Sequence, residues 1–312
     1  MVDAMVNVSI KMRVLVTGAN GFIGIQVCRA LLRNGHQVLA LWHRSRERLE
    51  KLTDDGNLQL EQGHILDADR LRQIVSAFSP EGICHLAVQP PGGSTRLSHQ
   101  VNVRGTGNLL EVCRRAGVDR LVYASSMSVY NFLSPAYLPV DEEHPLEPLQ
   151  DYGKEKWAAE ELCRHQARAG MRIPLLRLAG IYGPGKRSGA VYNFIRAVLR
   201  NQPVAIEQNR RVDLLHVEEA ARALVMALEG ADEIESALLN IGSGRSIALD
   251  ELALAIGSEV GREVRLDCRG NGNEFYLDIS RAKGMLGFTP LPLEEGLRRF
   301  IPWVEEEIDD VD

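Results

Sequence analysis

The sequence predicts an α/β fold in which a doubly wound parallel sheet is covered by helices on both faces. From Met12 onward, short apolar runs of strand length alternate with longer amphipathic segments of helix length. A glycine-rich turn, TGANGFIG at 17–24, joins the first of these runs to the first amphipathic segment. Together these observations favour buried, parallel strands with helices as their connections.

Each apolar run is bounded by turn residues, which sets the expected elements. Strands are expected at 13–18, 36–42, 58–65, 82–88, 120–126 and 173–180. Helices are expected at 22–35, 67–78, 101–117 and 154–170. A further strand and helix are expected within 212–230, and the stretch LEEGLRRFIPWVEEE predicts a terminal helix.

The regular alternation of predicted strands and helices stops after Gly180. The turn-rich stretch IYGPGKRSG at 181–189 predicts a domain boundary there. We therefore expect a first domain made of residues 12–180 plus 211–242. A smaller C-terminal α/β lobe is expected to contain residues 181–210 plus 243–312. Residues 1–11 precede the first predicted strand and are expected to be a loosely ordered lead-in.

Composition narrows the class of protein. The chain has 312 residues and a net charge of −6, with a pI near 5.8, which disfavours a nucleic-acid-binding surface. No uncharged apolar run approaches 18 residues, so no membrane span is predicted. The five cysteines are scattered and never spaced C-x-x-C, which is typical of reduced thiols in a cytoplasmic protein. The same scatter predicts no metal site.

The glycine turn predicts a dinucleotide site. Gly18, Gly21 and Gly24 allow a tight turn, close approach of the backbone to a pyrophosphate, and close packing of helix on strand. The start of the following helix supplies N–H groups and a positive dipole for the phosphates. A strand before the turn and a helix after it are the context in which such a motif binds a dinucleotide.

The end of the second predicted strand indicates which dinucleotide is bound. An acidic residue there holds the adenosine ribose 2′-hydroxyl of NAD. In this chain Trp42 stands at that place, and His43, Arg44 and Arg46 follow it. An arginine suits a 2′-phosphate because its planar fork donates two hydrogen bonds. The sequence therefore favours NADP over NAD.

A tyrosine and a lysine lie four residues apart in DYGKEKWAAEELC at 151–163. Tyr152 and Lys156 share one helix face. The lysine charge favours the phenolate form of the tyrosine, so the pair can exchange a proton with a carbonyl or hydroxyl group. The same spacing also occurs where a half-buried tyrosine simply lies beside a solvated lysine.

Read in order, the motifs resemble the extended short-chain dehydrogenase/reductase family, which includes nucleotide-sugar epimerases, dehydratases and ketoreductases. The motifs that carry the resemblance are TGANGFIG (17–24), HLAV (85–88), NVRGTGNLL (102–110), ASSMSVY (124–130), YGKEK (152–156), RLAGIYGPG (177–185), DLLHVEEAA (213–221), NIGSG (240–244) and DISRAKGMLGFTP (278–290). The resemblance runs from about Met12 to Glu305 and implies a Rossmann domain with a smaller substrate lobe.

The resemblance implies roles for three residues. Tyr152 passes a proton to or from the substrate oxygen, Lys156 holds the nicotinamide ribose, and Ser126 hydrogen-bonds the substrate oxygen. Asn102 is expected to have a structural or relay role near the cofactor. The residues expected to contact the dinucleotide are Gly18, Asn20, Gly21, Phe22, Ile23, Gly24, His43, Arg44, His64, Ile65, Leu86, Ala87, Val88, Asn102, Ala124, Tyr152, Lys156, Ala179 and Ile181. The residues expected to contact the substrate are Gln89, Ser126, Met127, Arg211 and Arg269.

Departures from the family pattern narrow the reaction. Dehydratases carry an acidic pair after the serine, where this chain has Met127 and Ser128, so dehydration is disfavoured. A nucleotide-sugar epimerase or 4-ketoreductase is expected, acting as a homodimer through helices at 103–116 and 154–169. Gly180 and Val212 leave open a reductase of a non-nucleotide carbonyl compound, similar to the dihydroflavonol-reductase branch. A non-catalytic NADP-binding sensor on the same fold is the other alternative.

Overall fold

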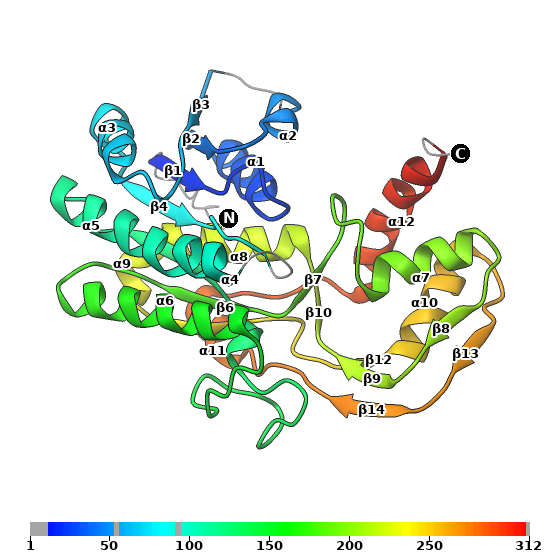
Figure 1. Ribbon diagram of the computed structural model, residues 1–312. Coiled ribbons are helices and arrows are strands. Elements are labelled where there is room, and N and C mark those ends of the chain that lie inside the picture. The colour runs from blue at the N-terminus through cyan, green and yellow to red at the C-terminus, as the bar shows by residue number, and fades with distance from the viewer. Residues whose placement is uncertain (1–11, 53–55, 91–94, 310–312) are drawn as a thin grey trace, which may run out of the picture. The chain divides into compact units, whose positions relative to one another are not determined.

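The computed structural model describes residues 12–52, 56–90 and 95–309, so the predicted lead-in at 1–11 lies outside the described residues. Its largest sheet confirms the predicted fold class, with seven strands covered by helices (Figure 1). The strands, in spatial order, are β11 (Leu238–Ile241), β6 (Leu175–Leu178), β5 (Leu121–Ser126), β4 (Gly82–His85), β1 (Arg13–Thr17), β2 (Gln37–Trp42) and β3 (Leu58–Gln62).

The strand order reverses at β1, which pairs in parallel with both β2 and β4. Val14 faces Val38 on one side and Gly82 on the other. In a parallel sheet of this kind, the crevice beyond the carboxyl ends of the strands at the reversal is where ligands bind. The turn after β1 is therefore the first place to look for a site.

The chain divides into two compact units, and each is described separately. The first contains residues 1–123, 161–174 and 224–236, and the second contains residues 124–160, 175–223 and 237–312. This division differs from the one that the sequence predicts, because the compact units divide the chain within α6 (Asp151–Arg168) and α8 (Val217–Glu229).

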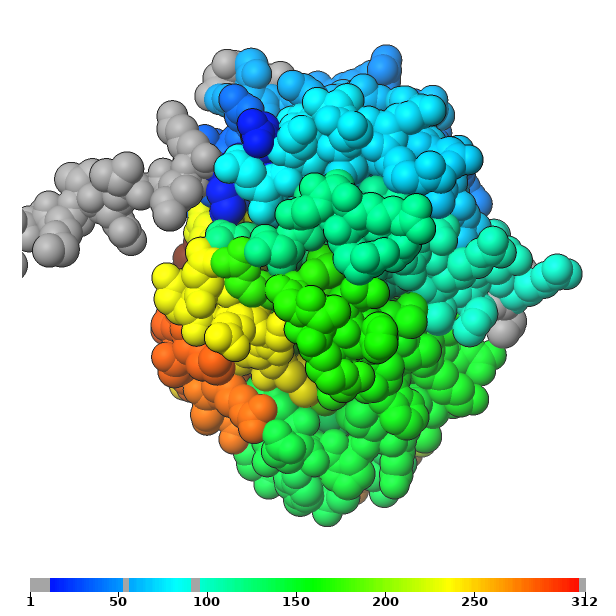
Figure 2. All heavy atoms as spheres, turned by 90° about the vertical axis from the view of Figure 1, so that its left-hand side faces the viewer, coloured from blue at the N-terminus to red at the C-terminus, as the bar shows by residue number. Residues whose placement is uncertain are grey.

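In the first unit, the strands are apolar because helices pack on them; Val14 and Val16 are fully buried. The helices that lie wholly in this unit are α1 (Gly24–Arg33), α2 (Glu47–Glu50), α3 (Ala68–Phe78), α4 (Thr95–His99), the π-helix η1 (Gln100–Gly105), α5 (Thr106–Ala116) and α9 (Ala231–Ile234). α3 and α5 pack against each other, and both reach the surface on the face turned to the viewer in Figure 2.

The second unit contains shorter elements in three small sheets, which pair β7 with β10, β9 with β12 and β14, and β8 with β13. Their bounds are β7 (Gly180–Tyr182), β8 (Val204–Ile206), β9 (Asn209–Val212), β10 (Leu214–His216), β12 (Ile247–Ala248), β13 (Leu266–Cys268) and β14 (Asn271–Glu274). The helices that lie wholly in it are the 3₁₀ turn η2 (Met127–Val129), α7 (Ala190–Leu199), α10 (Leu249–Val260), α11 (Ser280–Leu286) and α12 (Leu293–Asp309). Phe194, Leu252 and Phe300 belong to the apolar core that joins α7, α10 and α12.

Several element boundaries differ from those predicted. The strand predicted at 82–88 ends at His85. Just beyond it, the Leu86 N–H contacts both the carbonyl and the hydroxyl of Thr17, whereas the Ala87 N–H binds the Thr17 hydroxyl. The helix predicted at 101–117 begins with the wider π turn of η1. The strand predicted at 173–180 covers only 175–178, and Gly180 begins β7. No helix in the described part of the chain is long and apolar enough to cross a membrane.

Candidate active site

The glycine turn after β1 is tightly packed. Gly18 has φ of +68°, and a Cβ added there meets the Ala87 backbone nitrogen at 2.7 Å. A Cβ on Gly24 meets the Gly18 carbonyl oxygen at 2.2 Å, so no larger side chain fits. The Gly21 N–H donates to that same carbonyl at 2.9 Å and closes the turn. The turn therefore has the geometry that close approach of a pyrophosphate requires.

A pocket of about 420 Å³ lies against this turn, wholly within the first unit. Its lining contains most of the predicted dinucleotide contacts in this unit and adds several residues. The lining is Gly18, Asn20, Gly21, Leu41, Trp42, His43, Arg44, Ser45, Gly63, His64, Ile65, Leu86, Ala87, Val88, Gln89, Pro90, Leu97 and Val101. The predicted contacts Phe22, Ile23, Gly24 and Asn102 do not line it.

Sequence reasoning missed the apolar wall of this pocket. Leu97 and Val101 come from α4 and η1, far along the chain from the glycine turn, and no local motif marks them. Gly63 was also missed, although it directly follows β3 and so lies at the same edge of the sheet as the glycine turn. The position of Gly63 directly after a predicted strand is the feature by which the sequence could have identified it.

The basic end of the pocket combines residues that follow β2 and β3. The rings of His43 and His64 meet edge to face, with 4.2 Å between their centroids, and Arg44 lines the same pocket. Burial lowers the pKa of the His64 imidazole, and His43 and Arg44 lower it further, against the opposing effect of Asp67. No lining residue within the described chain is acidic.

Trp42 occupies the position of the expected acid and also lines the pocket. Its indole Nε1 is buried and has no hydrogen-bond partner within the described residues. The Arg46 guanidinium lies 5.8 Å from the centre of its ring. A donor without an acceptor, close to basic side chains, fits an anionic or oxygen-rich ligand better than a cationic one.

Asn102 acts on the loop that borders the pocket and is 2% exposed. Its Oδ1 accepts from the Gln89 N–H at 2.7 Å, and its Nδ2 donates to the Gln89 carbonyl at 3.1 Å and to Ser98 Oγ at 3.1 Å. These bonds hold the backbone of a lining residue in place. The role of Asn102 near the cofactor stays a prediction.

Ser126 ends β5 in the second unit. Its Oγ accepts from the Ser128 N–H at 3.1 Å and lies 3.1 Å from the Ser128 hydroxyl, so it caps the short η2 turn. The side chain is half-buried, and its hydroxyl is fixed at the strand end. Met127, a predicted substrate contact, begins η2 beside it.

Tyr152 and Lys156 lie one turn apart on α6, also in the second unit. Lys156 is 4% exposed, and its ammonium donates to the Ala124 carbonyl at 2.6 Å. It lies 5.9 Å from the centre of the Tyr152 ring. Lys156 is therefore anchored to β5 at Ala124, two residues before Ser126.

Burial opposes the phenolate character that Lys156 is predicted to give Tyr152. Burial raises the pKa of the Tyr152 hydroxyl to about 12, and the neighbouring Glu155 carboxylate adds to the rise. The phenol is consequently protonated at neutral pH. An additional positive charge at the site is needed before this hydroxyl can act as a base.

The two arginines predicted to bind substrate already have carboxylate partners. Arg211 Nη2 lies 3.1 Å from Glu251 Oε2, and Arg269 Nη2 lies 3.0 Å from Asp267 Oδ2. Two further predicted contacts, Ala179 and Ile181, lie where β6 leads into β7. The Ile181 carbonyl accepts from Lys186 at 2.7 Å, a contact that the sequence did not indicate.

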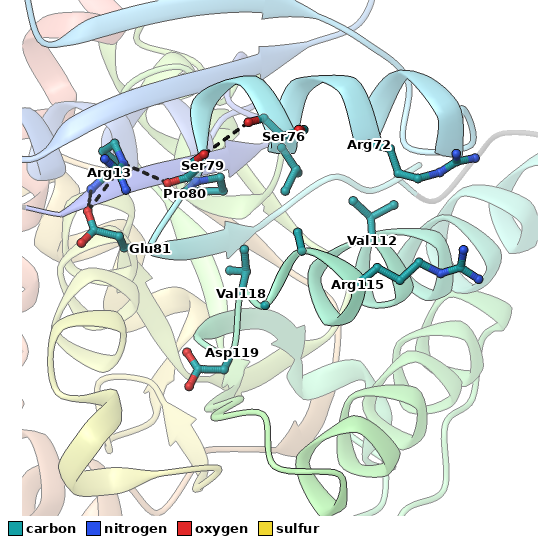
Figure 3. A pocket seen from close by; sticks show the side chains of 13 residues that line it. Arg13, Arg72, Ser76, Ser79, Pro80, Glu81, Val112, Arg115, Val118 and Asp119 are labelled. Carbon is teal, nitrogen blue, oxygen red and sulfur yellow. Dashed lines mark hydrogen bonds and ion pairs between the residues drawn. The ribbon is translucent and has the colours of Figure 1, made fainter.

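A larger hollow of about 670 Å³ lies elsewhere in the first unit (Figure 3). Arg13, Glu81 and Asp119 border it just before or at the start of strands, so it opens at the opposite edge of the sheet from the glycine turn. Arg13 Nε donates to the Ser79 carbonyl at 2.9 Å, and its backbone N–H donates to Glu81 at 2.9 Å. None of the predicted site residues lines it, and we assign it no function.

Comparison with other proteins supports one family throughout. A model of the NAD dependent epimerase/dehydratase family matches residues 14–242. The UDP-glucose 4-epimerase of Mycolicibacterium smegmatis is 32% identical over 314 residues, which cover 93% of this chain and 97% of the relative. The UDP-glucuronate 4-epimerase of Thermodesulfobacterium geofontis is 29% identical, with 95% and 97% covered.

Solved structures agree with these matches. The UDP-glucose 4-epimerase of Thermotoga maritima, crystallised with UDP-glucose, superposes with a TM-score of 0.83 at 27% identity, covering 95% of this chain and all of that one. The UDP-glucuronic acid 4-epimerase of Bacillus cereus, in complex with UDP-glucuronic acid and NAD, gives 0.84 at 26% identity, with the same coverage. The resemblance inferred from the motifs is confirmed. The chain belongs to the NAD dependent epimerase/dehydratase family.

Proposed function

We propose that this protein is a dinucleotide-dependent 4-epimerase of a nucleotide sugar, with a UDP-hexose or UDP-hexuronate as its substrate. One observation carries the proposal. The second unit holds Tyr152 and Lys156 on one face of α6, with Lys156 bonded to the strand that ends in Ser126. A phenol, an ammonium and a hydroxyl in that arrangement suit proton exchange with a sugar hydroxyl.

In this mechanism each of the three side chains has a separate task. Tyr152 takes the proton of the substrate C4 hydroxyl and later returns it. Ser126 donates a hydrogen bond to the same oxygen when it becomes a carbonyl. Lys156 holds one positive charge 5.9 Å from the centre of the Tyr152 ring, and a bound oxidised nicotinamide would add the further positive charge that the phenolate needs. When bound, the nicotinamide ring supplies a hydride acceptor and donor.

The pocket beside the glycine turn fits a dinucleotide, and we propose NADP as the preferred one. The turn keeps its tight shape because Gly18 and Gly24 lack side chains that would clash with the neighbouring backbone, and such a turn suits a pyrophosphate. His43 and Arg44 border the place where the adenosine ribose of a Rossmann dinucleotide lies. The absence of acidic side chains from the described lining favours a 2′-phosphate over a free 2′-hydroxyl.

The substrate class follows from the relatives and from what the site lacks. Two relatives that match over nearly the whole chain are UDP-sugar 4-epimerases. Met127 and Ser128 provide no acid to protonate a departing hydroxyl, so elimination of water is disfavoured. Epimerisation removes a hydride from C4 and a proton from its hydroxyl group, then returns the hydride to the opposite face of C4 and the proton to the oxygen, so it needs no such acid.

An isomerisation assay tests this proposal. The purified chain is incubated separately with UDP-glucose and with UDP-glucuronate, each with NADP⁺ or NAD⁺, and the C4 epimers are separated and quantified. We expect conversion between the two epimers without net change in dinucleotide absorbance. Stoichiometric consumption of NADPH by a 4-keto sugar, with no epimer formed, would instead identify a ketoreductase.

We also propose a homodimer that uses α5 and α6. Trp157 on α6 is 39% exposed, which is a large apolar surface for water to contact. Sedimentation velocity at micromolar concentration is expected to show a dimer, and Trp157→Glu is expected to shift it toward monomer. Leu254→Glu, on the exposed face of α10, is the matched control and leaves the dimer intact. A monomeric unmodified chain contradicts the proposal.

A further inference from the structure

Three residues of α6 lie on one face because they are four apart: Tyr152, Lys156 and Glu160. Two of them hold consecutive residues of β5. Lys156 donates to the Ala124 carbonyl at 2.6 Å, and the Ser125 hydroxyl donates to Glu160 Oε1 at 2.5 Å. The helix that carries the proposed proton donor is therefore bonded to the strand that ends in Ser126 at two successive turns.

Glu160 is also half of a buried ion pair. Its side chain is 0% exposed and that of Arg177, on β6, is 1% exposed. Arg177 Nη2 donates to Glu160 Oε2 at 2.7 Å, and Arg177 Nε donates to Oε1 at 3.0 Å. With Ser125 as the third donor, both carboxylate oxygens of Glu160 are occupied.

The guanidinium is itself fixed in position. Arg177 Nη1 donates to the Tyr130 hydroxyl at 2.8 Å, and that hydroxyl donates to Asn240 Oδ1 on β11 at 2.9 Å. The Asn240 N–H in turn donates to Glu142 at 2.7 Å. The ion pair therefore rests on a chain of buried hydrogen bonds within the second unit, and Glu160 has little freedom to move.

Stability alone does not explain such a pair. Taking two charges out of water is expensive, and well-packed apolar side chains of similar volume are often as stable as a buried ion pair. Apolar side chains cannot, however, make a directional bond to the Ser125 hydroxyl. What this pair provides is a fixed distance between α6 and the end of β5.

We propose that Glu160 is a positioning residue for the epimerase reaction. Arg177 holds its carboxylate in place, and the carboxylate binds Ser125. Through Ser125 it fixes the positions of the Lys156 and Ser126 side chains relative to Tyr152. This inference rests on the proposed function and deepens it. Glu160 does not contact the substrate. Its effect passes through Ser125, which lies between two residues of the proposed site. The carbonyl of Ala124 on one side holds Lys156, and the hydroxyl of Ser126 on the other side faces the reacting oxygen.

The variant Ser125→Ala distinguishes a role of Glu160 in positioning the site from a role in holding the fold together. It removes the bond to β5 but leaves the Glu160–Arg177 ion pair intact, so no buried charge loses its partner. Ser243→Ala is the matched control, because the Ser243 hydroxyl also donates to a buried carboxylate in the same unit, Asp213, at 2.7 Å. Both variants lose one hydroxyl-to-carboxylate hydrogen bond, and both are expected to lower the melting temperature slightly.

Only Ser125→Ala is expected to change the chemistry. Small displacements of catalytic groups have large effects on rate, and we expect kcat to fall about tenfold with KM unchanged. Because Lys156 then stabilises the phenolate less well, the rising limb of the kcat–pH profile moves to higher pH. Ser243→Ala keeps the kcat and the pH profile of the unmodified protein.

A second readout does not depend on turnover. Ultraviolet titration of the dinucleotide complex, with Tyr152→Phe subtracted, measures ionisation of this phenol directly, and Ser125→Ala is expected to raise its midpoint relative to Ser243→Ala. Equal midpoints and equal kcat in the two variants overturn the positioning role. If the unmodified protein epimerises none of the UDP-sugars, the proposed function fails, and the titration still decides the role of Glu160.

Discussion

Tyr152→Phe is expected to lower the rate of epimerisation about a thousandfold, within the range typical for loss of a general acid–base group. The ring still fills the same space, so packing around α6 is kept, but no proton can be exchanged with the substrate oxygen. Affinity for the dinucleotide is expected to change little, because the pocket beside the glycine turn does not include this side chain. Steady-state rates and fluorescence titration measure the two quantities.

Tyr137→Phe is the matched control for this variant. Tyr137 belongs to the same unit, but it is 43% exposed and its hydroxyl donates to Asp141 at 2.8 Å. Removal of that hydroxyl is expected to leave the rate unchanged. Turnover that survives in Tyr152→Phe would falsify the assignment of the phenol to proton transfer.

Arg44→Gln is expected to weaken the binding of NADPH by about 10- to 100-fold and to leave the binding of NADH unchanged. Hydrogen bonds to charged groups contribute about 1.5–3 kcal/mol, which corresponds to that range of affinity. The effect is confined to NADPH because only its ribose carries the extra phosphate. Dissociation constants for both dinucleotides at one fixed ionic strength measure it.

Arg33→Gln makes the same change in net charge at an exposed position at the end of α1, outside the lining of the pocket. It is expected to bind both dinucleotides as the unmodified protein does. If the unmodified protein binds NADH more tightly than NADPH, the preference inferred from His43 and Arg44 is wrong.

Local patterns in the sequence were enough to predict the fold. Buried parallel strands such as β1 have an apolar centre, and the helices between them have one apolar face, so the order of elements can be read without contacts. The glycine turn was predictable for a similar reason, since Gly18 and Gly24 are needed by backbone geometry within eight residues. The boundaries were less predictable because hydrogen bonds from elsewhere in the chain contribute to them, as the Thr17 hydroxyl does when it accepts from the Ala87 N–H just beyond β4.

The site itself depends on contacts that local patterns do not contain. Glu160 and Arg177 are 17 residues apart, and nothing in the sequence says that they meet. The effect of burial on the pKa of Tyr152 could not be predicted, because the spacing to Lys156 shows which face the two residues share but not how much water each loses. The pairing of Arg211 with Glu251 likewise depends on a neighbour 40 residues away, whereas Arg269 pairs with Asp267 only two residues before it.

The tight packing of the glycine turn has a consequence for affinity. Its shape is fixed by its own backbone bond between Gly21 and Gly18 and by close contact with the loop after β4. The conformational entropy of this segment is therefore lost when the chain folds rather than when a ligand arrives. A dinucleotide that enters a preorganised cradle keeps more of its contact energy as binding free energy.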